Sequence, residues 1–359
     1  MTDSPPPPTA HAPNDAKMVP STETISSDGD DTSDSDESLL DALGGDAPSP
    51  VVPLSVPDGL EAWDQLIRRV MRLLAASDFD KNWGEQFCAL TTQVRELAKN
   101  NPDMALYVLT LANGTGVDAY SAQHAMVCLV IAELAAAWLE WPESERLTLA
   151  RAALSMNVSM TSLQDSLARQ SSAMSDAQRQ LVGGHTTASV ELLTKAGVDD
   201  QLWLYAVQHH HTASQDLKGE SSEAGPRIAE LLRRVDIYTA KLSRRGSRVS
   251  VTPATAARDA CLDAKGNPDS IGATLLRIVG LYPPGTFVEL ANGETAVVVK
   301  RGEKAHTPIV ASLRREDGGL LMQPVRRDTQ RPSFAVRRGL QPGLVRVQFD
   351  HRRTLASVP

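Results

Sequence analysis

Histidines and one acidic residue are the side chains of this sequence best suited to chemistry. Four histidines, His185, His209, His210 and His211, fall within 27 positions, while His124 lies on an apolar segment upstream and Asp236 downstream. Imidazole and carboxylate groups are common ligands of first-row metals, and several helices of a bundle can direct them at one point. On a helix the adjacent His209 and His210 would differ in direction by about 100°, so each could face a different metal.

The same residues also have ordinary structural interpretations. A histidine triplet at a helix end is often a solvated last turn, where imidazolium complements the helix dipole. His124 on an apolar helix is typical of a hydrogen-bonded core residue. Asp236, close to Arg233 and Arg234, is typical of a surface charge. Spacing alone therefore leaves the metal site and these structural roles open.

Most of the chain has the periodicity of helices. Apolar residues recur at intervals of three and four from Leu60 onward, which predicts amphipathic helices. The predicted helices lie at about 60–74, 87–97, 103–112, 118–139, 144–154, 186–196, 200–210, 226–243, 253–262 and 269–279. The polar segment 156–180 is expected to hold loops and a short helix.

The pattern changes abruptly at Tyr282-Pro283-Pro284-Gly285. Two apolar runs, 287–290 and 295–299, flank Asn292-Gly293 and predict a β-hairpin with a type I′ turn. Further strands are expected at about 309–313 and 344–347. The predicted fold class is therefore mainly α, with a small C-terminal β unit.

Charge is unevenly distributed along the chain. The net charge is −8, but residues 1–50 contain eleven acidic residues and one basic residue. With its proline run and its Ser/Asp stretch, the segment 1–57 is predicted to be a disordered acidic tail. We expect it to be followed by an N-terminal helical segment (58–115), a helical domain (116–284) and a basic β unit (285–359).

Residues 300–359 contain thirteen basic and five acidic residues. This segment could bind an anion or attract the acidic tail of its own chain. Its only aromatic residues are Phe334 and Phe349, too few for a single-strand stacking platform, so nucleic acid is not an expected partner.

Nothing in the sequence indicates a membrane or secreted protein. No apolar run approaches the roughly 20 residues of a membrane span, and the N-terminus lacks the pattern of a secretory signal. Cys88, Cys128 and Cys261 are too widely separated to suggest a metal-binding pair or a disulfide framework. A cytoplasmic location is therefore expected.

From about residue 124 to 299 the chain resembles the HD-GYP family, bacterial hydrolases of the second messenger cyclic di-GMP. The resemblance implies an HD-domain-like helical bundle, metal binding and phosphodiesterase chemistry. The matching segments are His124-Ala125-Met126-Val127, Ala152-Ala153-Leu154, Gly184-His185-Thr186 at the family's His-Pro position, Gln208-His209-His210 at its His-His-Glu position, Arg227-Ile228, Val235-Asp236-Ile237-Tyr238 at its terminal Asp, and the segment from Leu281 to Glu294.

The family's defining motif, His-Asp-(apolar)-Gly-Lys, is altered in this chain. Met156 and Asn157 stand at the His and Asp positions, and Met160 stands at the Lys position. In the family the Asp bridges two metals, whereas Asn is neutral and a thioether is a soft ligand that suits iron or manganese poorly. His211 replaces the family's Glu, and Thr212–Gly225 contains no Asp-Gly-x-Gly-Tyr-Pro. No confident catalytic residue is therefore assigned, and the active site is predicted to be degenerate.

Enough candidate ligands remain for one divalent metal, iron or manganese, although a bundle that binds no metal is equally consistent. The remaining ligands are His124, His185, His209, His210 and Asp236. The expected function is a cyclic di-GMP signalling protein with a degraded catalytic centre and a regulatory or protein-interaction role. Two alternatives are an active phosphodiesterase with non-standard ligands and a silent scaffold that does not bind cyclic di-GMP. The expected partners are cyclic di-GMP or another bacterial signalling protein.

Overall fold

A computed structural model of the chain describes residues 55–115, 119–213, 216–217, 223–243, 251–262, 267–341, 345 and 347–358. Nearly all of the predicted tail, 1–57, lies outside the described residues, as does much of the segment 212–225. The last two residues of the predicted tail, 56 and 57, belong to the first described helix, so the helical body begins slightly earlier than expected.

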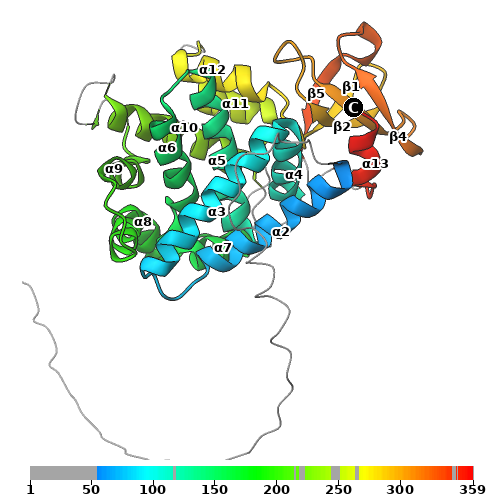
Figure 1. Ribbon diagram of the computed structural model, residues 1–359. Helices are drawn as coiled ribbons and strands as arrows, with labels where there is room; N and C mark the ends of the chain where they lie inside the picture. Colours follow the sequence, from blue (N-terminus) through cyan, green and yellow to red (C-terminus); the bar gives the residue numbers. More distant parts are fainter. Residues whose placement is uncertain are drawn as a thin grey trace, which may run out of the picture. The chain divides into compact units, whose positions relative to one another are not determined.

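The predicted mainly helical fold is confirmed (Figure 1). Helix α5 lies at the centre and is buried on almost all sides, against α4, α6, α10 and α12. Before the sheet the elements are α2 (Val56–Leu74), α3 (Lys81–Asn100), α4 (Pro102–Thr115), α5 (Tyr120–Trp138), α6 (Glu143–Ser155), the 3-10 turn η1 (Val158–Met160), α7 (Thr161–Arg169), α8 (Asp176–Lys195), α9 (Gln201–His209), α10 (Ala224–Leu242), α11 (Pro253–Cys261) and α12 (Ser270–Val279).

Helix α5 has the length and hydropathy of a membrane-crossing segment, although no apolar run of that length was apparent in the sequence. In the structure 78% of its most apolar stretch is buried by the rest of the protein. The central helix of a folded core has the same composition, so this feature is weak support for a membrane span.

Helix α8 begins about ten residues earlier than the periodicity predicted. Ser175 and Gln178 form a capping box, in which each side chain hydrogen-bonds to the backbone N–H of the other residue. The polar residues that follow were interpreted as a loop, but here they form the exposed first turns of a helix.

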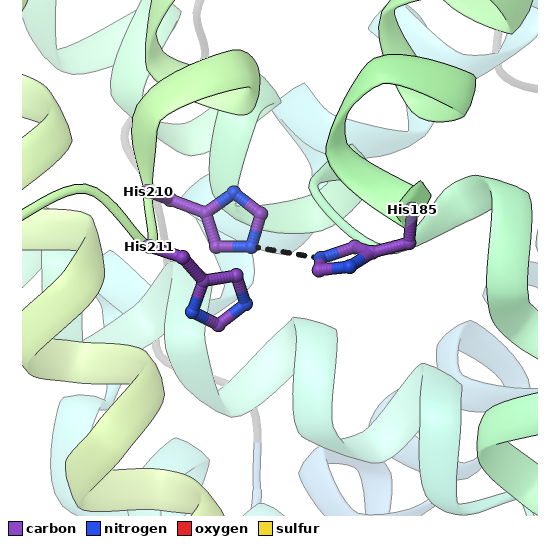
Figure 2. Close-up of side chains that lie close together, drawn as sticks. All are labelled: His185, His210 and His211. Atoms are coloured by element: carbon purple, nitrogen blue, oxygen red, sulfur yellow. Dashed lines mark hydrogen bonds between the residues drawn. The ribbon is translucent and has the colours of Figure 1, made fainter. Parts of the chain in front are cut away.

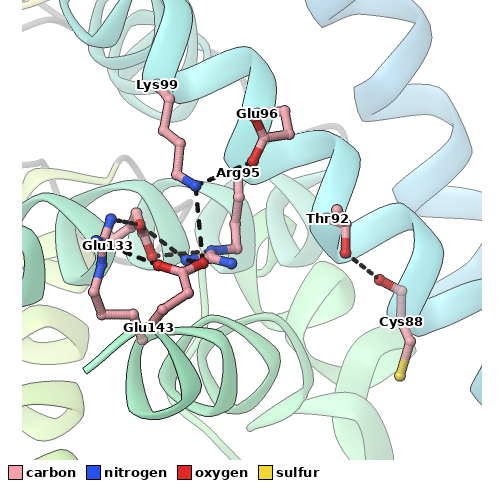
Figure 3. Close-up of polar contacts among 8 residues, drawn as sticks. Cys88, Thr92, Arg95, Glu96, Lys99, Glu133 and Glu143 are labelled. Atoms are coloured by element: carbon pink, nitrogen blue, oxygen red, sulfur yellow. Dashed lines mark hydrogen bonds and ion pairs between the residues drawn. The ribbon is translucent and has the colours of Figure 1, made fainter. Parts of the chain in front are cut away.

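A buried ionic network joins α3, α5 and α6 (Figure 3). The guanidinium group of Arg95 donates two hydrogen bonds to the carboxylate of Glu133, at 3.0 and 3.1 Å, and both side chains are almost fully buried. Arg146 also binds Glu133, and Glu143 accepts from Arg95 at 2.8 Å. Because Arg95 and Glu133 are both buried, removing either would leave the charge of the other less well compensated, so the pair constrains how α3 packs on α5.

The C-terminal part of the described chain is a five-stranded antiparallel sheet in the order β4-β3-β2-β1-β5. The hairpin and the third strand are confirmed, but β4 and β5 were missed, and the described residues 345 and 347 are not in a strand. The elements are β1 (Phe287–Leu290), β2 (Thr295–Lys300), β3 (Ile309–Arg314), β4 (Leu320–Asp328), the 3-10 turn η3 (Pro332–Phe334), β5 (Val336–Leu340) and α13 (His351–Ala356).

The hairpin turn differs from the predicted type I′. Gly293 has a φ of +78°, but Asn292 is not among the residues with positive φ. The amide of Gly293 donates to the carbonyl of Leu290, and the amide of Leu290 donates to the carbonyl of Glu294. The loop is therefore one residue longer than a two-residue turn, and only glycine occupies the left-handed region.

The two faces of the sheet contribute to different clusters. Phe287, Val297 and Val299 belong to one continuous buried core that extends through the helical part as far as Trp63. Helix α4 packs on β2, and α13 packs on both α2 and β4. The opposite face forms a smaller cluster of Tyr282, Val288, Leu290, Ala296, Val298 and Val310.

Candidate metal centre

Three histidines from two neighbouring elements face one another in the helical body (Figure 2). His185 lies in α8, and His210 and His211 follow directly after the end of α9. His185 and His210 are buried, whereas His211 is exposed. The nearest ligand atoms of the three rings lie within 4.8 Å of one another, so this group could hold a metal ion.

The rings of His185 and His210 are oriented by their own backbones. The Nδ1 atom of His185 lies 2.6 Å from the carbonyl oxygen of Val182, and that of His210 lies 2.8 Å from the carbonyl of Val207. Each Nδ1 must therefore donate a proton, which leaves a lone pair on each Nε2. The two Nε2 atoms face each other at 3.3 Å. Metal-ligating histidines are commonly held in this way, with the outer nitrogen donating to a carbonyl.

Both rings are held in the neutral state. Burial, together with the proximity of His211, lowers the pKa of His210 to about 3. Burial also lowers the pKa of His185. At neutral pH no proton bridges the two Nε2 atoms, so their lone pairs repel unless a cation lies between them. Two nitrogens bound to a tetrahedral metal at about 2.0–2.1 Å would be separated by about 3.3–3.4 Å, which matches the observed distance.

His211 supplies the exposed side of this group. Its ring centroid lies 4.2 Å from that of His210 and 5.1 Å from that of His185. The sequence interpretation placed His211 at the family's Glu position and did not include it among the ligands. A third imidazole at this position gives the buried pair a partner that is open to solvent.

A second group, also able to hold a metal, consists of His124, Cys128 and Asp236 and is buried throughout. The Nε2 of His124 lies 2.8 Å from Oδ1 of Asp236 and 3.7 Å from the sulfur of Cys128. Cys128 was missed as a potential ligand, although its spacing of four residues from His124 puts both side chains on one face of α5.

The charges of this second group differ from those of the first. Burial would raise the pKa of Asp236, but the hydrogen bond from His124 and the nearby histidines together lower it, so the carboxylate is ionised. His124 then donates from Nε2, and its buried Nδ1 has no partner in the described part of the chain. Burial, reinforced by the negative charge of Asp236, raises the pKa of the Cys128 thiol well above its ordinary value. This group is therefore organised as a hydrogen-bonded cluster and is less prepared for a metal than the His185 group.

The five predicted ligands are not all brought together. His185 and His210 fall in the first group and His124 and Asp236 in the second. The charge of Asp236 partly offsets the fall in pKa of both His185 and His210, so the two groups are neighbours. His209 belongs to neither group, because its ring packs on Tyr205 and its Nδ1 lies 3.3 Å from the Thr212 hydroxyl.

The altered motif lies beside His185. Ser159 donates from its hydroxyl to the carbonyl of His185 at 2.8 Å, and its amide donates to Ser189 at 3.2 Å. Met156 is fully buried, and the amide oxygen of Asn157 is buried without a partner among the described residues. The segment therefore packs against α8, with the neutral amide of Asn157 at the position where the sequence resemblance expected a carboxylate.

Comparison of the chain with protein-family models, curated proteins and solved structures found no match.

Proposed function

We propose that this chain is a metal-binding bacterial signalling protein, related to the HD-GYP hydrolases, whose phosphodiesterase centre is degraded. One observation carries the proposal: two neutral, buried imidazoles present opposed Nε2 lone pairs at 3.3 Å, with both outer nitrogens donating to carbonyls. Such a pair is stabilised by a cation. The resemblance of the surrounding motifs to HD-GYP proteins supports a cytoplasmic regulatory role, with cyclic di-GMP or another signalling protein as partner.

The donor set favours iron over manganese. Imidazole nitrogens suit iron and zinc, whereas manganese prefers oxygen ligands. His185, His210 and His211 offer three nitrogens, and the ionised Asp236 lies close to them. Iron is therefore the proposed occupant ahead of manganese. When bound, it would link α8 to the end of α9 and supply a Lewis-acidic centre.

The proposed loss of catalysis depends on Met156 and Asn157. Hydrolysis in the family uses two cations joined by a carboxylate, and the neutral amide of Asn157 supplies no negative oxygen for that bridge. The buried thioether of Met156 is a soft, weak ligand. We therefore propose a binding function in place of turnover.

Metal analysis of the purified full-length protein tests the metal centre. We expect about one iron per chain in the wild type, and loss of most of it in His185→Ala and His210→Ala. His209→Ala is the matched control, since His209 lies next in sequence but outside both groups. A wild type without metal, or equal retention by all three variants, would refute the centre.

Cyclic di-GMP assays separate the proposed role from its alternatives. With added iron or manganese we expect no turnover, and calorimetric titration should show saturable binding of the dinucleotide. Efficient turnover would support the active phosphodiesterase with non-standard ligands. Absence of binding heat in metal-loaded protein would support the silent scaffold.

A further inference from the structure

A cavity of about 270 Å³ lies where the end of α12 meets the loop between β2 and β3. No residue of either histidine group lines it. Its polar lining comes from three cationic side chains, two carboxylates and a tyrosine, namely Arg277, Arg301, Lys304, Asp103, Glu303 and Tyr282.

One of the three cations already has a partner. The Nε of Arg301 lies 2.6 Å from a carboxylate oxygen of Asp103, and its Nη1 donates to the carbonyl of Ile278 at 2.8 Å. The backbone amide of Arg301 donates to the same carboxylate at 3.1 Å. Asp103 is therefore neutralised, and this pair fixes the start of the loop against α4 and the end of α12.

The other two cations have no carboxylate partner among the described residues. The guanidinium of Arg277 lies over the ring of Trp138, 5.3 Å from its centroid, and makes one long contact of 3.5 Å with the carbonyl of Glu303. Lys304 is exposed and forms no ion pair in the described part of the chain. Once the Asp103–Arg301 pair is set aside, the cavity has two cations against the single carboxylate of Glu303, and it is net positive.

The loop adds unused backbone donors to this charge. Its carbonyls are engaged, because Lys304 accepts from the amide of Thr307 and Ala305 accepts from the amide of Leu281. The N–H groups of residues 302–305 have no acceptor among the residues that the structure describes. Consecutive free amides with neighbouring cations are typical of sites that hold phosphate.

The loop also approaches its own backbone and the end of α12 closely. A Cβ at Gly302 would lie 1.8 Å from the carbonyl oxygen of Thr307, so the chain folds back on itself too closely for another residue. At the end of α12, Gly280 has a φ of +78°, and a Cβ there would lie 3.2 Å from the carbonyl of Ala305. These close approaches require glycine at both positions, and the hydrogen bond from the amide of Leu281 to the carbonyl of Ala305 ties the loop to the end of α12.

We propose that this cavity binds the phosphate group of a small ligand, through the guanidinium of Arg277, the ammonium of Lys304 and the amides of the loop. A cationic donor paired with a phosphate oxygen forms a strong, charge-assisted hydrogen bond. The site is separate from the metal centre and does not depend on the proposed function. Free phosphate, pyrophosphate and a mononucleotide share the chemistry that it recognises.

Titration of the full-length protein with pyrophosphate tests the site, by calorimetry at low salt and by tryptophan fluorescence. Trp138 is 56% exposed and stacks on Arg277, so a ligand that engages Arg277 should change its emission. Arg277→Gln and Lys304→Gln should each weaken binding about tenfold. Arg315→Gln is the matched control, an exposed arginine of the same β unit outside the cavity, and should leave the affinity within about twofold.

Two further titrations, with inorganic phosphate and with GMP, show which kind of phosphate ligand the cavity prefers. Tighter binding of GMP would support a nucleotide ligand, and equal or tighter binding of inorganic phosphate would support a free anion. Absence of saturable pyrophosphate binding by the wild type would overturn the proposal. Equal losses in Arg277→Gln, Lys304→Gln and Arg315→Gln would overturn it as well, because they would show nonspecific attraction to positive charge.

Discussion

At His185 and His210, burial lowers the pKa of the imidazole ring, whereas the hydrogen bond from Nδ1 to the backbone partly opposes that fall and fixes the tautomer. Burial lowers both pKa values, and the carbonyls of Val182 and Val207 hold the remaining proton on Nδ1. Neither ring can act as a proton donor toward the other at neutral pH. Their chemistry is that of Lewis bases, which is why the pair supports metal binding better than acid–base catalysis.

Asn157 is the residue at which the proposed loss of a metal-bridging carboxylate can be tested most directly. Its amide oxygen is buried without a partner, so Asn157→Asp would place a carboxylate there with nothing described to pair it. We expect the melting temperature to fall in a chelator and to recover when iron is added, because a cation would then neutralise the new charge. Thermal unfolding with and without metal measures both effects.

Asn82→Asp is the control for this substitution, since Asn82 is exposed in the first turn of α3. Its melting temperature should not depend on metal. The interpretation of Asn157 as a residue beside the metal centre would be wrong if iron shifted both variants equally. Combining Asn157→Asp with Met156→His extends the test to turnover.

At the scale of elements, local signals predicted the helices and the first hairpin well, and failed where pairing over long distances decides the structure. The strand β4 pairs with β3 through an irregular register and is mostly exposed, so its sequence lacks the alternation of a half-buried strand. The strand β5 pairs with β1, which lies far away in the sequence, and no local sequence pattern predicts this pairing. The predicted range of helix α8 was too short because the first turns of this helix are polar.

Gly84 marks a close contact between two helices. A Cβ at this position in α3 would lie 2.5 Å from the carbonyl oxygen of Ala196, at the end of α8. Gly84→Ala should therefore force these elements apart and lower the free energy of unfolding by about 1–3 kcal/mol. Gly183→Ala in α8 is the control, because nothing lies within 4 Å of its Cβ.

At Gly183 the substitution should raise the free energy of unfolding by roughly 0.5–1 kcal/mol, through helix propensity alone. Urea denaturation of both variants gives the comparison. Similar changes of the same sign would show that the α3–α8 contact is unimportant.

Glu294 connects three parts of the sheet and should make its stability depend on pH. It accepts from Arg327 on β4 at 2.8 and 2.9 Å and from Ser312 on β3 at 2.6 Å. The hydrogen bond from Arg327 lowers the pKa of Glu294 from 4.5 to about 2, against the opposing effect of burial. Because the folded pKa lies below the unfolded one, the stabilisation is complete above about pH 5 and is lost as the pH falls toward 2.

The size of this contribution is on the order of 3 kcal/mol at pH 7, and about 2 kcal/mol of it should be lost by pH 3. Glu294→Gln should be less stable at pH 7 and show a correspondingly flatter decline. Urea unfolding at both pH values measures the difference, with the exposed Glu191→Gln as control. Parallel pH profiles for the wild type and Glu294→Gln would contradict the assignment.

At the scale of the whole molecule, the candidate site was only partly predictable. His185, His210, His124 and Asp236 were identified as candidates, but their division into two neighbouring groups depends on how α5, α8, α9 and α10 pack. His211 and Cys128 were missed, since residue type and order do not show which side of a packed helix end a ring occupies. The positively charged cavity could not be predicted from the sequence, because Arg277 and Lys304 come to line it only when the sheet packs against α12.

Net charge is the property of the whole chain that acts on this cavity. Residues 1–50 carry eleven acidic residues and one basic residue, so removing them changes the net charge from −8 to +2. A polyanion such as pyrophosphate is repelled by a net charge of −8 and not by a net charge of +2. Deletion of residues 1–50 should therefore strengthen pyrophosphate binding severalfold at 0.01 M salt, where charges interact over about 30 Å, and have no effect at 1 M salt, where the range is about 3 Å. A full-length variant with the eleven acids changed to Asn or Gln separates charge from chain length and should behave like the deletion. A gain in affinity that persists at 1 M salt, or that only the deletion produces, would show that charge is not the cause.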